Sequence, residues 1–235
     1  MHTNNIEKYE ERYIHFDFVK LPKILETHLM PGPLSLADLG CGDGPWFNLL
    51  HQQGFISEAC PVYAVDLDKT RLERITTRFP WITTIVGSVE SIPNIPDQSV
   101  DFVISTMVME HVFNEEKYLL EVRRILKLSA KAYITTVFKK KWAIFYRRRK
   151  GEFVLDTSHI REYTDIVAFQ KLINDCGLKI LDIRLIQLKI QIFRPIFRIW
   201  KRSKRSINLG LRLLLMPKLP IPGYYELEFV VNRQV

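Results

Sequence analysis

The stretch "ADLGCGDGPWF", residues 37–47, places three glycines at alternate positions directly after an apolar run. The run LSLADLG (34–40) is short, apolar and ends at glycine, which predicts a buried strand. Residues 45–54 then have apolar spacing typical of a helix. A glycine-rich turn between a strand and a helix directs backbone N–H groups at a ligand. We therefore expect a ligand site at the end of the first strand.

Strand-like and helix-like stretches alternate along the rest of the chain. Strands are expected at 61–68, 81–88, 99–106, 130–138, 178–190 and 224–233, and helices at 5–28, 69–79, 115–127 and 163–177. This order predicts an α/β fold: a Rossmann-like doubly wound sheet of about seven strands, mostly parallel, with an antiparallel last strand. We expect one domain over 1–235, with an N-terminal helical cap (1–30) and a cofactor-binding core (36–137).

Positive charge is concentrated late in the chain. The net charge is +8, yet residues 183–225 hold ten Lys and Arg and no Asp or Glu, which leaves 24 basic and 26 acidic residues elsewhere. We expect a basic helical insertion at 191–222, before the last strand. Its mixture of basic, aromatic and leucine residues suits a lid over the substrate, an anionic membrane surface contacted through 193–218, or, less well, nucleic acid.

No apolar run reaches the roughly 18 residues of a membrane span. Cys41, Cys60 and Cys176 stand far apart with no CxxC pair, which favours a reducing compartment over a disulfide framework or a zinc site. We expect a cytoplasmic protein without a bound metal, peripheral on the inner face of the membrane if the insertion contacts lipid.

Two nucleotide-binding fingerprints do not fit the glycine loop. A GxGxxG motif that starts at Gly40 requires its third glycine at position 45, which is Pro45. No GK[ST] follows for a phosphate-binding P-loop.

The glycines at 40, 42 and 44, after a strand that carries Asp38, resemble motif I of the class I S-adenosylmethionine-dependent methyltransferases, of the type 11-like small-molecule family. Four later segments resemble that family in the same order: Asp66 at the end of the second strand, GSVESIP (87–93), DFVISTMVMEHV (101–112) and LLEVRRILKLSAKAYITT (119–136). HIREYT (159–164) extends the resemblance.

This resemblance implies S-adenosylmethionine as cofactor. By position it implies that Gly40, Gly42 and Gly44 lie against the methionine part and ribose, that Asp38 orients the loop and the cofactor's amino group, and that Asp66 accepts both ribose hydroxyls. Leu67, Ser88 and Val89 would surround adenine, and Thr106 and Met107 would lie near the sulfonium. Ser88 departs from the family's usual Asp. Simpler roles stay open: Asp38 as a cap, Asp66 as a solvated strand end and Met107 as core.

Two histidines follow predicted strand ends on the ligand side. His111 follows Glu110 after the fourth strand, and His159 precedes the helix that follows the fifth. A hydroxyl acceptor benefits from a general base, so we expect His111 or His159 to assist proton removal and Arg161 to anchor an anionic or sugar substrate. The alternatives are a structural hydrogen bond at a helix start for His111, and a surface-loop or helix-cap position for His159.

The reaction that these features favour is O-methylation of a small molecule or a lipid-linked sugar. The absence of [DN]PP[YFW] after the fourth strand disfavours exocyclic-amine methylation of nucleic acid. The alternatives are an RNA-modifying methyltransferase that uses the basic insertion, and a non-catalytic cofactor-binding homologue.

Overall fold

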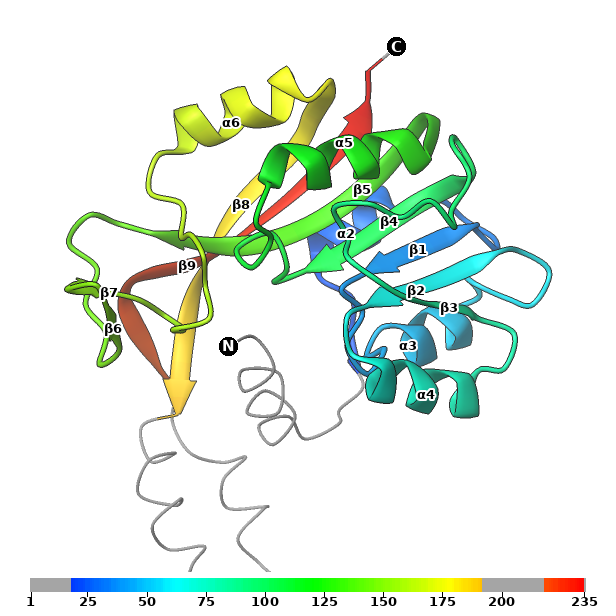
Figure 1. Ribbon diagram of the computed structural model, residues 1–235, viewed down its shortest axis with the longest axis horizontal. Helices are drawn as coiled ribbons and strands as arrows, with labels where there is room; N and C mark the ends of the chain where they lie inside the picture. The colour runs from blue at the N-terminus through cyan, green and yellow to red at the C-terminus, as the bar shows by residue number, and fades with distance from the viewer. Residues whose placement is uncertain (1–17, 192–217, 235) are drawn as a thin grey trace, which may run out of the picture.

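A computed structural model describes residues 18–191 and 218–234. Its centre is a seven-stranded sheet in the order β3-β2-β1-β4-β5-β9-β8 (Figure 1). The strands are β1 (Leu36–Leu39), β2 (Val62–Asp66), β3 (Thr83–Val86), β4 (Val100–Thr106), β5 (Leu126–Lys139), β8 (Leu178–Gln191) and β9 (Lys218–Arg233). All neighbouring pairs from β3 to β5 are parallel, and β9 runs antiparallel to both β5 and β8. The predicted fold class is confirmed, including the antiparallel last strand.

Helices cover both faces of the sheet because alternate residues of each central strand point to opposite sides. Ala37 and Leu39 of β1 pack with α5 (Glu115–Ile125) and α6 (Ile166–Asp175). Leu36 of the same strand packs with α2 (Lys23–His28), α3 (Phe47–Gln52) and α4 (Lys69–Arg78) on the other face. The sheet is therefore buried on both sides, as its almost continuous apolar strands predict.

Helix starts follow the local sequence. Asp68, Asn114 and Asp165 accept backbone N–H groups of the first turns of α4, α5 and α6. Each cap supplies acceptors for amides that have no partner inside the helix. The predicted helices at 69–79, 115–127 and 163–177 are confirmed, with ends shifted by up to three residues.

Two parts of the prediction change at the C-terminal side. The last strand begins at Lys218 rather than 224, so residues 218–222 belong to β9 and not to the predicted insertion. They pair with the end of β8, where Gln191 faces Lys218, and this pairing outweighs the two prolines of the segment. A short hairpin of β6 (Arg148–Arg149) and β7 (Glu152–Phe153) was also not expected. The rest of the insertion, and most of the N-terminal cap, lie outside the described residues.

Within residues 18–191 and 218–234, no helix has the length and apolar character required to cross a bilayer.

Candidate active site

The loops that follow β1, β2, β3 and β4 meet at one edge of the sheet, since these strands are parallel (Figure 1). Open α/β sheets bind ligands at this edge. The predicted site residues from Asp38 to His111 lie on or after these four strand ends.

The glycine loop has a backbone that side chains rarely allow. Gly40, Gly42 and Gly44 have φ angles of +73°, +55° and +68°. A Cβ atom on Gly40 would lie 2.3 Å from a methyl group of Val108, and one on Gly44 would lie 2.6 Å from the ring of Phe47. Glycine at 40 and 44 is thus required by contacts within the protein as well as by backbone conformation.

Asp66 connects the glycine loop to the end of β2. Its Oδ2 accepts the Gly42 N–H at 2.8 Å, and its Oδ1 accepts the Asp68 N–H at 2.9 Å. Each carboxylate oxygen has a second lone pair, so both can accept further donors such as vicinal hydroxyls. The residue is half-buried, which differs from a freely solvated strand end.

Asp38 is a buried carboxyl that lacks a partner for one oxygen. Its side chain is 1% exposed, and its Oδ2 has no hydrogen-bond partner within the described residues. Burial, together with the nearby negative charge of Asp66, raises the pKa of Asp38 well above its usual range. A bound cationic amine would satisfy this oxygen and favour the ionised form. The residues present therefore fit an amino-acid cofactor.

The predicted adenine wall is open to solvent on one side. Leu67 is 70% exposed, while Val89 is buried. Ser88 accepts the Glu90 N–H through its Oγ at 3.2 Å, which leaves its hydroxyl proton as a donor. Val86, which our sequence prediction omitted, is 58% exposed and lies beside Asp66 in the β2–β3 register. The sequence signal that could have identified Val86 is an apolar residue at the end of a predicted strand.

The loop after β4 starts with a strained residue. Met107 has φ +56°, which is rare for a side chain other than Gly, Asn or Asp. Its N–H is held by both the carbonyl (3.0 Å) and the hydroxyl (3.1 Å) of Thr135 on β5. Such conformations persist where surrounding contacts impose them, often at functional sites. Thr106 and Met107 are both partly exposed at this edge.

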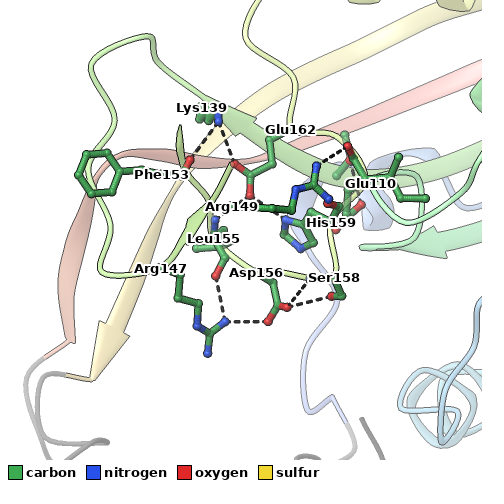
Figure 2. A network of polar contacts seen from close by, with 12 residues as sticks. Glu110, Lys139, Arg147, Arg149, Phe153, Leu155, Asp156, Ser158, His159 and Glu162 are labelled. Carbon is green, nitrogen blue, oxygen red and sulfur yellow. Dashed lines mark hydrogen bonds and ion pairs between the residues drawn. The ribbon is translucent and has the colours of Figure 1, made fainter. Parts of the chain in front are cut away.

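Two histidines that are 48 positions apart meet beyond this loop. The rings of His111 and His159 lie 4.9 Å apart at 75°. His159 is buried, and its Nδ1 lies 2.8 Å from Oε1 of Glu162, as Figure 2 shows. Glu110 is fully buried and accepts the Thr136 hydroxyl at 2.9 Å through Oε2. The structure thus brings both predicted histidines together with a carboxylate.

Burial shifts the titration of this cluster. It raises the pKa of Glu110 to about 7, although hydrogen bonding and the charge of His159 oppose the shift. It lowers the pKa of His111 to about 4, and the positive form of His159 adds to that effect. His111 is therefore a neutral imidazole at neutral pH.

Glu110 and Glu162 were not among the predicted site residues. Both stand inside segments that carried the family resemblance, Glu110 directly before His111 and Glu162 three residues after His159. The sequence could not show that Glu162 turns back onto His159, because the residues between them adopt no regular structure.

The loop that carries His159 is fixed by basic side chains (Figure 2). Arg149 of β6 donates to the backbone carbonyls of His159 and Ile160, the latter at 2.7 Å. Lys139, the last residue of β5, lies 3.4 Å from Glu162. The hairpin and β5 thereby hold the histidine at the sheet edge.

Arg161 is largely committed within the protein. Its guanidinium donates to three carbonyls of the loop after β4, those of Met109 (3.2 Å), Val112 (2.5 Å) and Phe113 (2.9 Å). Its Nε also lies 2.9 Å from Glu115. These contacts position the loop that carries His111. The predicted role in anchoring a substrate stays a prediction.

Residues 37–134 match the family described as "Methyltransferase domain". The chain carries a class I S-adenosylmethionine-dependent methyltransferase domain. The matched range of this methyltransferase domain begins one residue before Asp38 and ends on β5, so it contains the glycine loop, Asp66 and the Glu110–His111 pair.

Relatives of the domain agree with this family. A protein of Mycobacterium tuberculosis named as a probable S-adenosylmethionine-dependent methyltransferase is 29% identical over 99 residues, which cover 42% of this chain and 34% of that protein. A ubiquinone biosynthesis O-methyltransferase of Rickettsia bellii is 29% identical over 122 residues, or 52% of this chain and 50% of the relative. The chain therefore spans between a third and a half of the length of these relatives.

The fold of the methyltransferase domain also occurs in solved structures. The crystal structure of a SAM-dependent methyltransferase from Methanosarcina mazei covers 92% of this chain and 100% of its own, with a TM-score of 0.61 and 18% identity.

The first prediction concerns the unpartnered carboxyl. Folding raises the pKa of Asp38, so the folded chain binds its proton more tightly than the unfolded chain, and wild-type stability falls as pH rises from about 3.9 towards the folded value. Asp38→Asn abolishes this loss. We expect the cofactor-free variant to melt at or above the wild-type Tm at neutral pH, while S-adenosylmethionine affinity falls at least about ten-fold.

Scanning fluorimetry across about pH 5 to 8 and calorimetry with the cofactor measure the two effects. Asp101→Asn is the control. Hydrogen bonds from Lys127 and Ser35 lower the pKa of Asp101, although burial alone would raise it. Removal of the Asp101 carboxylate should therefore reduce Tm. A destabilised Asp38→Asn protein, or one with full cofactor affinity, would contradict the prediction.

The second prediction concerns the approach of Val108 to Gly40. Gly40→Ala combines a left-handed backbone with a steric clash, so we expect it to cost about 2 kcal/mol or more and to weaken cofactor binding. Gly54→Ala has a similar φ of +77° but open space around the added methyl, so it should cost only about 1 kcal/mol. Adding Val108→Ala to Gly40→Ala should restore part of the difference in urea unfolding. Equal costs at 40 and 54 would show that the contact is unimportant.

Proposed function

We propose that the protein methylates a hydroxyl oxygen of a small molecule, with S-adenosylmethionine as the donor. One observation supports this most strongly. The loop after β4 contacts the glycine loop through Val108. Two residues later the same loop carries Glu110 and His111, next to His159. An acceptor bound between the glycine loop and this cluster would face the cofactor edge on one side and two imidazoles on the other.

The residues present match the requirements of the transfer. S-adenosylmethionine, when bound, would supply a methyl carbon that an oxygen lone pair attacks in line. The C–S bond breaks, and its electron pair stays on sulfur. Asp38 would bind the ammonium group, Asp66 the ribose hydroxyls, and Leu67, Val86 and Val89 the adenine. These contacts would hold the reactants in a productive orientation, which supplies much of the acceleration in such displacements.

A hydroxyl acceptor must also lose a proton. Alcohols and phenols are weak nucleophiles in their neutral form, so a group that lowers their effective pKa raises the rate. The cluster of Glu110, His111 and His159 is the group of described residues that suits this role, since its functional atoms converge within 4.8 Å. The Rickettsia bellii relative is named as an O-methyltransferase, which supports an oxygen acceptor.

The surface of the loop after β5 favours an amphipathic acceptor or an anionic membrane partner. Trp142, Ile144 and Tyr146 are 57–65% exposed at alternate positions. The exposed basic residues around them are Lys140, Lys141, Arg148 and Lys150. The intervening Ala143 and Phe145 pack inward with Tyr224 of β9. Aromatic side chains flanked by positive charge suit a lipid interface. We therefore extend the proposed membrane contact from 193–218 to this described loop.

The third prediction tests the acceptor cluster. His111→Ala and His159→Ala should each reduce turnover by about 100-fold or more while cofactor affinity changes little, because neither side chain is among the residues expected to contact the cofactor. Label transfer from methyl-tritiated S-adenosylmethionine to 3,4-dihydroxybenzoate, and to a detergent extract of lipids, measures turnover; calorimetry measures binding.

His51→Ala is the control, because His51 lies on α3 among Phe79 and Trp81. Unchanged turnover in both cluster variants would contradict the proposed role. Cofactor binding without transfer to either acceptor pool would instead favour the non-catalytic homologue, and salt-sensitive transfer to RNA would favour the nucleic-acid alternative.

The fourth prediction tests the lipid contact. A triple variant, Trp142→Ala, Ile144→Ala and Tyr146→Ala, removes apolar area from the exposed loop, and its sedimentation with phosphatidylglycerol vesicles should fall about ten-fold. Val167→Ala, which is 70% exposed on α6, should sediment as the wild type does. Equal sedimentation of the triple variant and the wild type would remove this loop from the proposed surface.

A further inference from the structure

We propose that Glu110, His111 and His159 form a binding site for one divalent transition-metal ion. Each residue offers one ligand atom, and these three atoms lie within 4.8 Å of one another. The residues come from two loops, one after β4 and one before α6, so the site exists only in the folded chain. The sequence contained no metal-ligand spacing because the two loops are distant along the chain.

Each ligand residue also has a partner outside the three-residue cluster. The Nδ1 of His159 is held by Glu162 at 2.8 Å, so its Nε2 is the atom available to a metal (Figure 2). A backbone hydrogen bond with Ser158 holds the ring of His111. Histidines that bind metals usually have their second nitrogen fixed by a carboxylate or a carbonyl in this way.

The carboxylate gives a second, independent indication. Glu110 is fully buried, and while its Oε2 accepts the Thr136 hydroxyl, its Oε1 has no hydrogen-bond partner within the described residues. A buried oxygen without a partner costs free energy that a bound cation would recover. The negative charge of Glu226 also acts on Glu110.

Basic neighbours lie on the outer side of the cluster. Lys139 approaches Glu162 rather than the ligand atoms, and Arg149 donates to the backbone carbonyls of His159 and Ile160. These groups contact Glu162 and the backbone of the histidine loop. His111 is the least buried of the three ligands and gives the ion a route from solvent.

The spacing requires a modest closure. Metal–ligand bonds of about 2.1 Å in a tetrahedral site place ligand atoms about 3.4 Å apart, so the atoms must approach by up to about 1.4 Å. Binding of a metal therefore requires a small movement of these three side chains.

The ligand set indicates the class of metal. Two imidazoles and one carboxylate suit Zn²⁺, Fe²⁺, Co²⁺ or Mn²⁺ better than Mg²⁺ or Ca²⁺, which prefer oxygen ligands. Three protein ligands leave a coordination position open for an acceptor oxygen. This inference rests on the proposed function in one respect: the ion would lower the pKa of the acceptor hydroxyl, whose proton passes to solvent before methyl transfer.

The test is a titration of the full-length chain, stripped with chelator, with Co²⁺ as a spectroscopic probe and with Zn²⁺ by calorimetry. Wild type should bind one equivalent and develop visible absorption bands. Glu110→Gln and His159→Gln, which approximate the native shapes, should lose binding at least 100-fold, and Glu162→Gln about ten-fold. His51→Ala should bind as the wild type does, and unchanged cofactor affinity in every variant shows that the fold is intact.

Absence of bands in wild type, or equal bands in wild type and His159→Gln, overturns the metal site. Label transfer by chelator-stripped protein that still depends on His159 overturns it too, while the proposed methylation stands. Co²⁺ binding lost in the cluster variants, combined with no transfer under any metal condition, supports the site and removes the proposed function instead.

Discussion

The site depends on one constraint, the close approach of Val108 in the loop after β4 to Gly40 in the loop after β1. β1 and β4 are adjacent and parallel, so their following loops must leave the sheet side by side. Only a residue without Cβ at position 40 lets the second loop pass this closely. The same contact fixes the start of the loop that presents Glu110 and His111. The cofactor edge and the acceptor cluster therefore have one geometric origin, and neither can shift without the other.

The sheet and most helices could be predicted because the signals are local. Apolar strands, Asp and Asn caps and the glycine turn each act over a few residues, and the parallel order follows from their alternation. The start of β9 was mispredicted because its pairing with β8 spans an intervening segment of 26 residues and overrides the two prolines. Edge and hairpin strands depend on partners that no local window contains.

The site was predictable only in part for the same reason. The sequence places Asp38, Asp66 and His111 at strand ends, but it does not show which atoms lack partners. Glu162 contacts His159 across an irregular loop. Arg161 donates its hydrogen bonds to backbone carbonyls that lie 48 to 52 positions earlier in the chain. The basic run at 139–150 reads as a surface patch, yet Arg149 and Lys139 are used internally to support the histidine loop.

Two buried carboxylates give the site its chemical character. Asp38 lies on β1 and Glu110 in the loop after β4, and each has one oxygen without a hydrogen-bond partner among the described residues. Burial without full pairing disfavours their charged forms and reduces the stability of the folded chain. A cation at each would reverse that cost: an ammonium group at Asp38, and a metal ion at Glu110. The same unfavourable burial that weakens the free protein would thus strengthen the binding of two positive partners.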